Sequence, residues 1–145
     1  MTPSEYRSRL RARLIELKGR GLGPANVDDV VAAPNTRDRS QTLIETADRR
    51  RPEQPRDLQF ANGATLRLRV DFEHVAGNWS LFGYCFHFAK GERWFRYDRD
   101  PDRASGPTHP RDHLHVGSEE PRYPTGDGAD PLLLLDFLEA QGLLR

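Results

Sequence analysis

A change in the spacing of apolar residues near residue 58 constrains the fold of this chain more than any other feature. Apolar and charged side chains alternate through residues 66–73, LRLRVDFE, which is the pattern of a strand with one buried face. The next run, residues 79–89, WSLFGYCFHFA, is largely apolar on both faces, as is typical of a strand inside a sheet. Asn62-Gly63 and Gly77-Asn78 supply turn residues before and between these strands. We therefore predict an antiparallel sheet over residues 58–117.

Strict alternation divides the side chains of the second strand between two faces. The predicted faces hold Phe82, Tyr84, Phe86 and Phe88 on one side, and Trp79, Leu81, Cys85 and His87 on the other. Because both faces are largely apolar, both need cover. Residues 35–55 or a second copy of the chain would supply it, so a homodimer is one candidate assembly.

A helix is expected at each end of the chain. Apolar residues at positions 6, 10, 14 and 17 form one stripe of a basic helix over residues 1–20, with Ser4 as its cap. Asp130 and Pro131 suit the N-cap and first turn of a second helix, over residues 130–144. Between the first helix and the sheet, residues 21–57 are polar and rich in arginine, and we predict a loop region there.

This order of elements predicts one α+β domain spanning residues 1–145. Its core would be an antiparallel meander of four to five strands, with the N- and C-terminal helices packed on one face.

Composition narrows the class of protein. The formal net charge is zero, so no global field attracts nucleic acid or an anionic membrane. The single cysteine, Cys85, excludes a disulfide within the chain and fits a reducing compartment. The N-terminal residues lack the apolar core of a signal peptide, and the longest apolar run is too short to cross a bilayer. We expect a cytoplasmic protein that does not contact a membrane.

The candidate site lies in residues 93–123, which hold His109, His113 and His115. In a strand, His113 and His115 point to one face, while Leu114 and Val116 point to the core. Two imidazoles on one face can divide acid and base roles or chelate one transition metal. The spacing fixes no third strong ligand, so we predict neither a metal nor another cofactor.

Charged neighbours suit a phosphodiester substrate. Asp98 ends the preceding strand and is expected to orient one imidazole, as carboxylates commonly do. Arg96 and Arg111 are candidate phosphate clamps, with His109 as a third substrate-binding residue. Aromatic side chains nearby, Tyr97 among them, are suited to stacking on bases.

The same stretch resembles the TumE-like toxins of bacterial toxin–antitoxin modules. The resemblance rests on Tyr97-Asp98, on the run DHLHVG at residues 112–117, and on the acidic, proline and aromatic residues EEPRY at 119–123. It covers the chain from about Leu58 to the C-terminus, with a longer insert before His113. It implies a toxin neutralised by an antitoxin protein, and carries functional roles over to Tyr97, Asp98, His113, His115 and Gly117.

Together these features predict a ribonuclease-like toxin that cleaves RNA by histidine acid–base chemistry. His113, His115, Asp98 and Tyr97 are its predicted catalytic residues. The alternative is a non-catalytic module of such a system that binds protein or nucleic acid through the basic helix and the arginine-rich loop. A metal-dependent hydrolase is the third reading.

Overall fold

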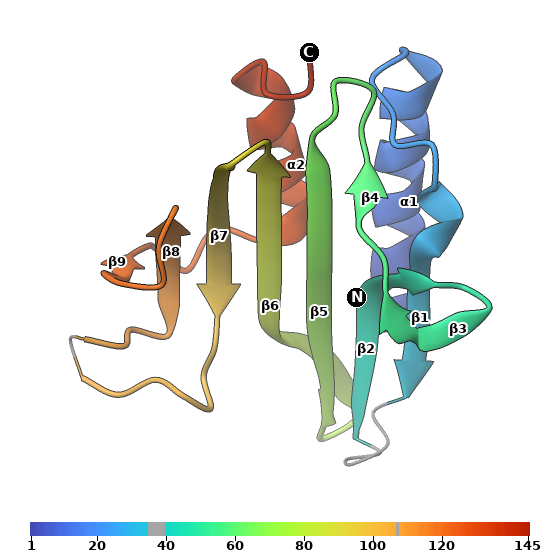
Figure 1. The fold of residues 1–145 in the computed structure, drawn as a ribbon. Coiled ribbons are helices and arrows are strands. Elements are labelled where there is room, and N and C mark those ends of the chain that lie inside the picture. Colours follow the sequence, from blue (N-terminus) through green and yellow to red (C-terminus); the bar gives the residue numbers. More distant parts are fainter. Residues whose placement is uncertain (35–39, 107) are drawn as a thin grey trace.

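One antiparallel sheet forms the body of the chain, as the computed structural model in Figure 1 shows. The structure describes residues 1–34, 40–106 and 108–145. The strands of these residues are β1 (Val30–Pro34), β2 (Gln41–Asp48), β3 (Arg51–Pro55), β4 (Leu58–Gln59), β5 (Thr65–Val75), β6 (Asn78–Lys90), β7 (Arg93–Arg99), β8 (Asp112–Val116) and β9 (Tyr123–Pro124). Their order across the sheet is β1-β2-β5-β6-β7-β8-β9, with β3 paired to β2 and β4 to β5.

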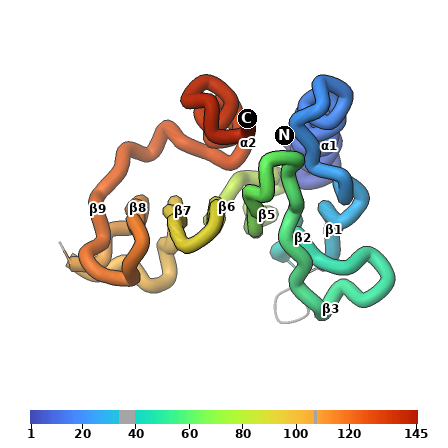
Figure 2. The backbone as a smooth tube through the Cα atoms, turned by 45° about the horizontal axis from the view of Figure 1, so that its top comes forward, coloured from blue at the N-terminus to red at the C-terminus, as the bar shows by residue number. Residues whose placement is uncertain are grey.

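Helices α1 (Pro3–Gly19) and α2 (Pro131–Ala140) both lie against one face of this sheet (Figures 1 and 2). Leucines of both helices share one core cluster with the inward side chains of β5 and β6. Arg13 of α1 also pairs with Asp136 and Glu139 of α2, which ties the two helices together. The predicted α+β class with terminal helices is confirmed. Among the described residues, no helix is long and apolar enough to cross a membrane.

The predicted number of strands was wrong, because the sheet has nine strands in the described part of the chain and not four to five. Three of the additional strands, β1, β2 and β3, come from residues 21–57, which we predicted as a loop. A short 3-10 helix, Val27–Asp29, precedes them. Part of the predicted loop, residues 35–39, lies outside the described residues. β3 is exposed along its whole length, so burial gave its sequence no apolar alternation.

A bulge corrects the predicted faces of β6. Asp71 pairs with Gly83 and Phe72 with Leu81, so Phe82 is the extra residue. Because one extra residue reverses the alternation, Trp79 and Leu81 pack against the core instead of facing away from it. Beyond the bulge the prediction holds, with Tyr84, Phe86 and Phe88 in the core.

Side-chain caps fix the helix starts. Thr2, not Ser4, caps α1: its hydroxyl accepts from the Glu5 backbone N–H, and the Glu5 carboxylate accepts from the Thr2 N–H. The predicted cap of α2 is confirmed, because Asp130 Oδ1 accepts from the backbone N–H groups of Leu132 and Leu133 at 2.8 and 3.1 Å.

We expect Asp130→Ala to lower the free energy of unfolding by about 1–2 kcal/mol, because it removes both cap bonds of α2 and the acceptor of the Tyr6 hydroxyl. Urea denaturation measures the loss. Asp127→Ala is the matched control, since this exposed aspartate contributes only its backbone carbonyl to a hydrogen bond that the structure describes. Equal stability of the two variants would contradict the capping role.

Candidate functional site

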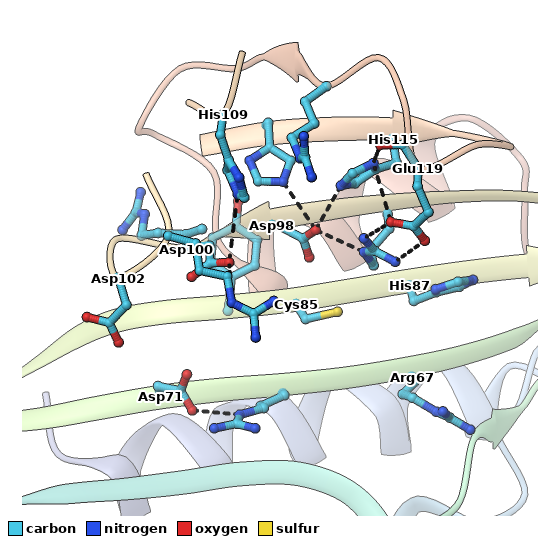
Figure 3. A pocket seen from close by; sticks show the side chains of 17 residues that line it. Arg67, Asp71, Cys85, His87, Asp98, Asp100, Asp102, His109, His115 and Glu119 are labelled. Carbon is cyan, nitrogen blue, oxygen red and sulfur yellow. Dashed lines mark hydrogen bonds and ion pairs between the residues drawn. The ribbon is translucent and has the colours of Figure 1, made fainter. Parts of the chain in front are cut away.

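A cleft of about 590 Å³ lies on the face of the sheet that points away from the helices. Residues of β5, β6, β7 and β8 form its wall, and most of them alternate along their strands, because successive side chains of a strand point to opposite faces. The apolar set faces the helices and the polar set faces the cleft. Figure 3 shows Asp98, His109, His115 and Cys85 directed into this space.

Three side chains converge in the wall of the cleft. Asp98 on β7 lies opposite His113 on β8 in the antiparallel register. Its Oδ2 atom is 3.4 Å from His113 Nε2 and 3.2 Å from His115 Nε2. The two imidazoles are 2% and 1% exposed and the carboxylate 13%. These residues form what we call the Asp98–His113–His115 cluster.

Backbone carbonyls hold the other nitrogen of each imidazole. His113 Nδ1 lies 2.7 Å from the carbonyl oxygen of Pro110, and His115 Nδ1 lies 2.9 Å from that of Glu119. A carbonyl oxygen only accepts, so each Nδ1 carries the hydrogen. The loops on either side of β8 therefore set both the tautomer and the orientation of the rings.

The burial of these histidines corrects one prediction. We expected Leu114 and Val116 in the core, but Val116 is 58% exposed and Leu114 is half-buried. The histidines are buried instead, because the loop carrying Glu119 folds over them. Leu114 and Val116 lack cover on the opposite face, because α2 does not reach this edge of the sheet (Figure 2).

Arg96 extends the cluster toward Glu119. Its Nε donates to Asp98 Oδ2 at 2.9 Å, and its two terminal nitrogens donate to the two oxygens of Glu119 at 3.1 and 2.9 Å. Hydrogen bonds from Arg96 hold the pKa of Glu119 below its usual range. Each of the three nitrogens of this guanidinium thus donates to a carboxylate, and Arg96 positions Asp98 instead of lying free for a phosphate.

The charges of the cleft are close to balanced. Among the described residues that line it, six are arginines and five are carboxylates. The arginines are Arg67, Arg69, Arg96, Arg99, Arg103 and Arg122. Arg103 is the most accessible of the six, with a side chain 79% exposed and 3.9 Å from Asp100. An anion entering the cleft would meet Arg103 before the buried cluster.

Two further side chains border the cluster. The His109 ring is in edge contact with His113 at 5.3 Å between centroids, and its Nε2 is 4.0 Å from Asp100 Oδ2. His109 is 20% exposed, which makes it more accessible than His113 and His115. Cys85 lies opposite Asp98 on β6. Burial, followed by the Asp98 charge, raises the pKa of the Cys85 thiol to about 12, so this thiol is neutral and unreactive at physiological pH.

Of the predicted site residues, Asp98, His113, His115, Arg96 and His109 lie together in the cleft. Two do not. Tyr97 faces the helices and packs edge-on against Phe95 at 5.8 Å. Arg111 donates to Asp112 at 2.8 Å and does not line the cleft. Pro107, in the insert before His113, lies outside the described residues.

Sequence reasoning missed the roles of Glu119 and Cys85. Glu119 is brought to the cluster by the loop after β8, and no periodicity predicts such a contact. The position of Cys85 in the cleft wall could have been predicted. Cys85 and His87 are two residues apart in one strand, so both point to the face opposite Phe86.

Comparison with known proteins gives one family. The sequence profile of the family described as Toxin TumE matches residues 32–140. The match begins within the arginine-rich segment, before the part of the chain that carries the sequence motif. No curated protein and no solved structure matches the chain.

Proposed function

The chain belongs to the TumE toxin family, and from this premise we propose that it acts on RNA by breaking phosphodiester bonds in the cleft. The observation that carries the proposal is the convergence of Asp98, His113 and His115 beneath an opening bordered by an exposed arginine. A polar concave site with several histidines and a buried carboxylate is suited to proton transfer. We expect the cluster to be the reaction centre.

The proposed reaction is the transfer of a phosphate ester within RNA. The 2′ oxygen of a ribose forms a bond to phosphorus while the bond from phosphorus to the 5′ oxygen of the next nucleotide breaks. A base takes the proton of the 2′ hydroxyl, and an acid gives a proton to the leaving 5′ oxygen, so charge and atoms balance. Positioned proton transfer of this kind contributes about 10²–10⁴-fold in rate.

The geometry refines the roles expected from the sequence. Each Nε2 of His113 and His115 faces Asp98, so either imidazole can serve as acid or base only when it turns from Asp98 to the substrate. His109 already has access to the cleft and is the proposed proton-transfer partner at its opening. Arg103 replaces Arg111 as the proposed phosphate contact, because guanidinium groups bind phosphate oxygens through paired donors.

The family also suggests the partner. A toxin of a toxin–antitoxin pair is held inactive by its antitoxin protein, and we propose such a partner for this chain, acting in the cytoplasm where RNA is accessible. Association with a second copy of the chain stays a prediction, which sedimentation of the purified protein would test.

The alternative is a non-catalytic module that binds through its basic helix and its arginine-rich loop, and the contacts of the helix give it less support. Arg11 pairs with Asp28 at 2.7 Å, Arg13 with Asp136 at 2.8 Å, and Arg20 with Glu139. Arg7 donates to the Val30 carbonyl at 2.9 Å. These arginines are engaged within the fold, so they offer little free charge to a nucleic acid.

Expression of wild type and of the double variant His113→Asn, His115→Asn in a bacterial host tests the proposal. Asparagine retains a donor near the position of Nδ1 and removes Nε2, so each bond to a backbone carbonyl can persist. We expect wild type to arrest growth and degrade RNA, and the double variant to cleave RNA at least about 100-fold more slowly. Growth rate and total RNA integrity are followed in the same cultures.

The matched control is His74→Asn, because His74 is exposed, lies outside the cleft and contacts Trp79 with its ring tilted by 45°. It should behave as wild type. Thermal unfolding of the purified variants checks that both are folded. Growth arrest by the double variant with intact RNA would move toxicity to binding and overturn the proposal.

A further inference from the structure

The convergence of Asp98, His113 and His115 raises a question of charge. Because both Nδ1 atoms donate to backbone carbonyls, each Nε2 of a neutral ring presents a lone pair. Both lone pairs point to a carboxylate oxygen that is itself an acceptor. Three electron-rich atoms gathered around one point repel one another unless a cation lies among them.

Protonation of the two imidazoles accounts poorly for the distances between their Nε2 atoms and Asp98 Oδ2. An imidazolium N–H that donates to a carboxylate brings nitrogen and oxygen to about 2.7–2.9 Å. The two distances here are 3.4 and 3.2 Å. Two charged rings would also join the Arg96 guanidinium, 2.9 Å away, around one carboxylate.

A metal ion accounts for the distances better. Two donor atoms each about 2.1 Å from one ion lie about 3.0–3.4 Å apart, for right-angled to tetrahedral coordination. The two nitrogen–oxygen separations of the cluster, 3.4 and 3.2 Å, fall in this range. The three donor atoms all lie within 4.8 Å of one another.

We propose that Asp98 Oδ2, His113 Nε2 and His115 Nε2 bind one divalent transition metal ion. Nitrogen and oxygen donors suit zinc, manganese, iron or cobalt, and three protein ligands leave a coordination position open toward the cleft. Asp98 and Glu119 outweigh the single charge of Arg96 by one negative charge, which favours a cation at this point.

The surroundings resemble those of a built metal site. Ligating histidines commonly donate their second nitrogen to a carbonyl or carboxylate, which fixes the tautomer that binds the metal. The carbonyls of Pro110 and Glu119 do this here. Arg96 is a positioning residue, because it holds Asp98 through Nε while Glu119 holds its other two nitrogens.

The use of the ion rests on the proposed function, whereas its binding does not. In RNA cleavage, a bound ion would neutralise a phosphate oxygen and lower the pKa of a coordinated water. His113 and His115 would then act as ligands, and His109 would stay free for proton transfer.

Titration of the full chain, purified without a histidine tag and treated with chelator, tests the site. Zinc sulfate binding is followed by calorimetry, and cobalt chloride binding by the visible absorption that reports coordination by nitrogen and oxygen. We expect one ion per chain. His113→Asn and His115→Asn should each weaken zinc binding at least about 100-fold, whereas His87→Asn, in the same cleft wall but outside the cluster, should bind as wild type.

Two results would overturn the inference: no saturable binding of zinc or cobalt, or binding that both cluster variants retain, which would indicate an adventitious ion. Thermal unfolding, compared with and without zinc, keeps the test valid if a variant is less stable, because only a protein that binds zinc is stabilised by it. Metal bound by a protein that leaves RNA intact would support the site and overturn the proposed function. RNA cleavage by metal-free protein would support the proposed function and overturn the use of the ion in the reaction, while the zinc and cobalt titrations alone decide the binding site.

Discussion

We expect Phe86→Ala to lower the free energy of unfolding by about 3–5 kcal/mol, because it opens a cavity at the centre of the core. Phe86 is fully buried in β6, where it pairs with Leu68 of β5 and Tyr97 of β7. A domain of this size is stable by only about 5–15 kcal/mol. The variant should therefore unfold at a clearly lower urea concentration than wild type.

Phe137→Ala is the matched control, because it removes the same aromatic ring from a position of α2 that is 39% exposed. Phe137→Ala should lower the free energy of unfolding much less than Phe86→Ala does. Similar losses for the two variants would mean that the helix-side face of β6 is not the centre of the core. β6 lies between β5 and β7, which also line the cleft. A loss of zinc binding or RNA cleavage in the Phe86 variant would therefore show how far core packing supports the site.

The central strands were predictable because burial shapes their sequences. β5 alternates between buried and outward side chains through most of its length, and the sequence carries the same alternation. β2 and β3 were not predictable in this way. β3 is held by backbone pairing to β2 with all its side chains exposed, so hydrogen bonds that leave no pattern in the side chains determine it.

The candidate site was predictable in part for the same reason. His113 and His115 are two residues apart, so any strand places them on one face. Their burial and their common contact with Asp98 depend on the register between β7 and β8. The register of two strands joined by a loop as long as residues 100–111 cannot be predicted from local sequence. For the same reason, Asp98 could not be predicted as the third ligand of the proposed metal site.

One error could have been avoided with the sequence alone. Tyr97 and Asp98 are neighbours in a strand, so their side chains point to opposite faces. Both could not belong to a site on one face. The resemblance to the toxin family gave Tyr97 a functional role beside Asp98, and strand geometry separates the two: Tyr97 supports the core, and Asp98 faces the cleft.

Asp98→Asn should have the largest effect of any single change in the cleft. The carboxylate is the group on which Arg96, His113 and His115 converge, and the amide keeps its shape while removing its charge. We expect zinc binding and RNA cleavage each to fall at least about 100-fold, more than the loss of a residue that only supports a ligand. Calorimetry and cleavage of a labelled RNA measure the two effects on one preparation.

Asp102→Asn is the matched control, because Asp102 is an exposed carboxylate in the lining of the same cleft and lies outside the cluster. It removes the same charge, so a general change in the field of the cleft would affect both variants alike. A loss confined to Asp98→Asn would assign the effect to the convergence of the three side chains. RNA cleavage by Asp98→Asn within about tenfold of wild type would remove Asp98 from the reaction centre, since loss of a positioned catalytic group costs at least about 10²-fold. The cleft would then be a surface that binds RNA and leaves the chemistry to another site.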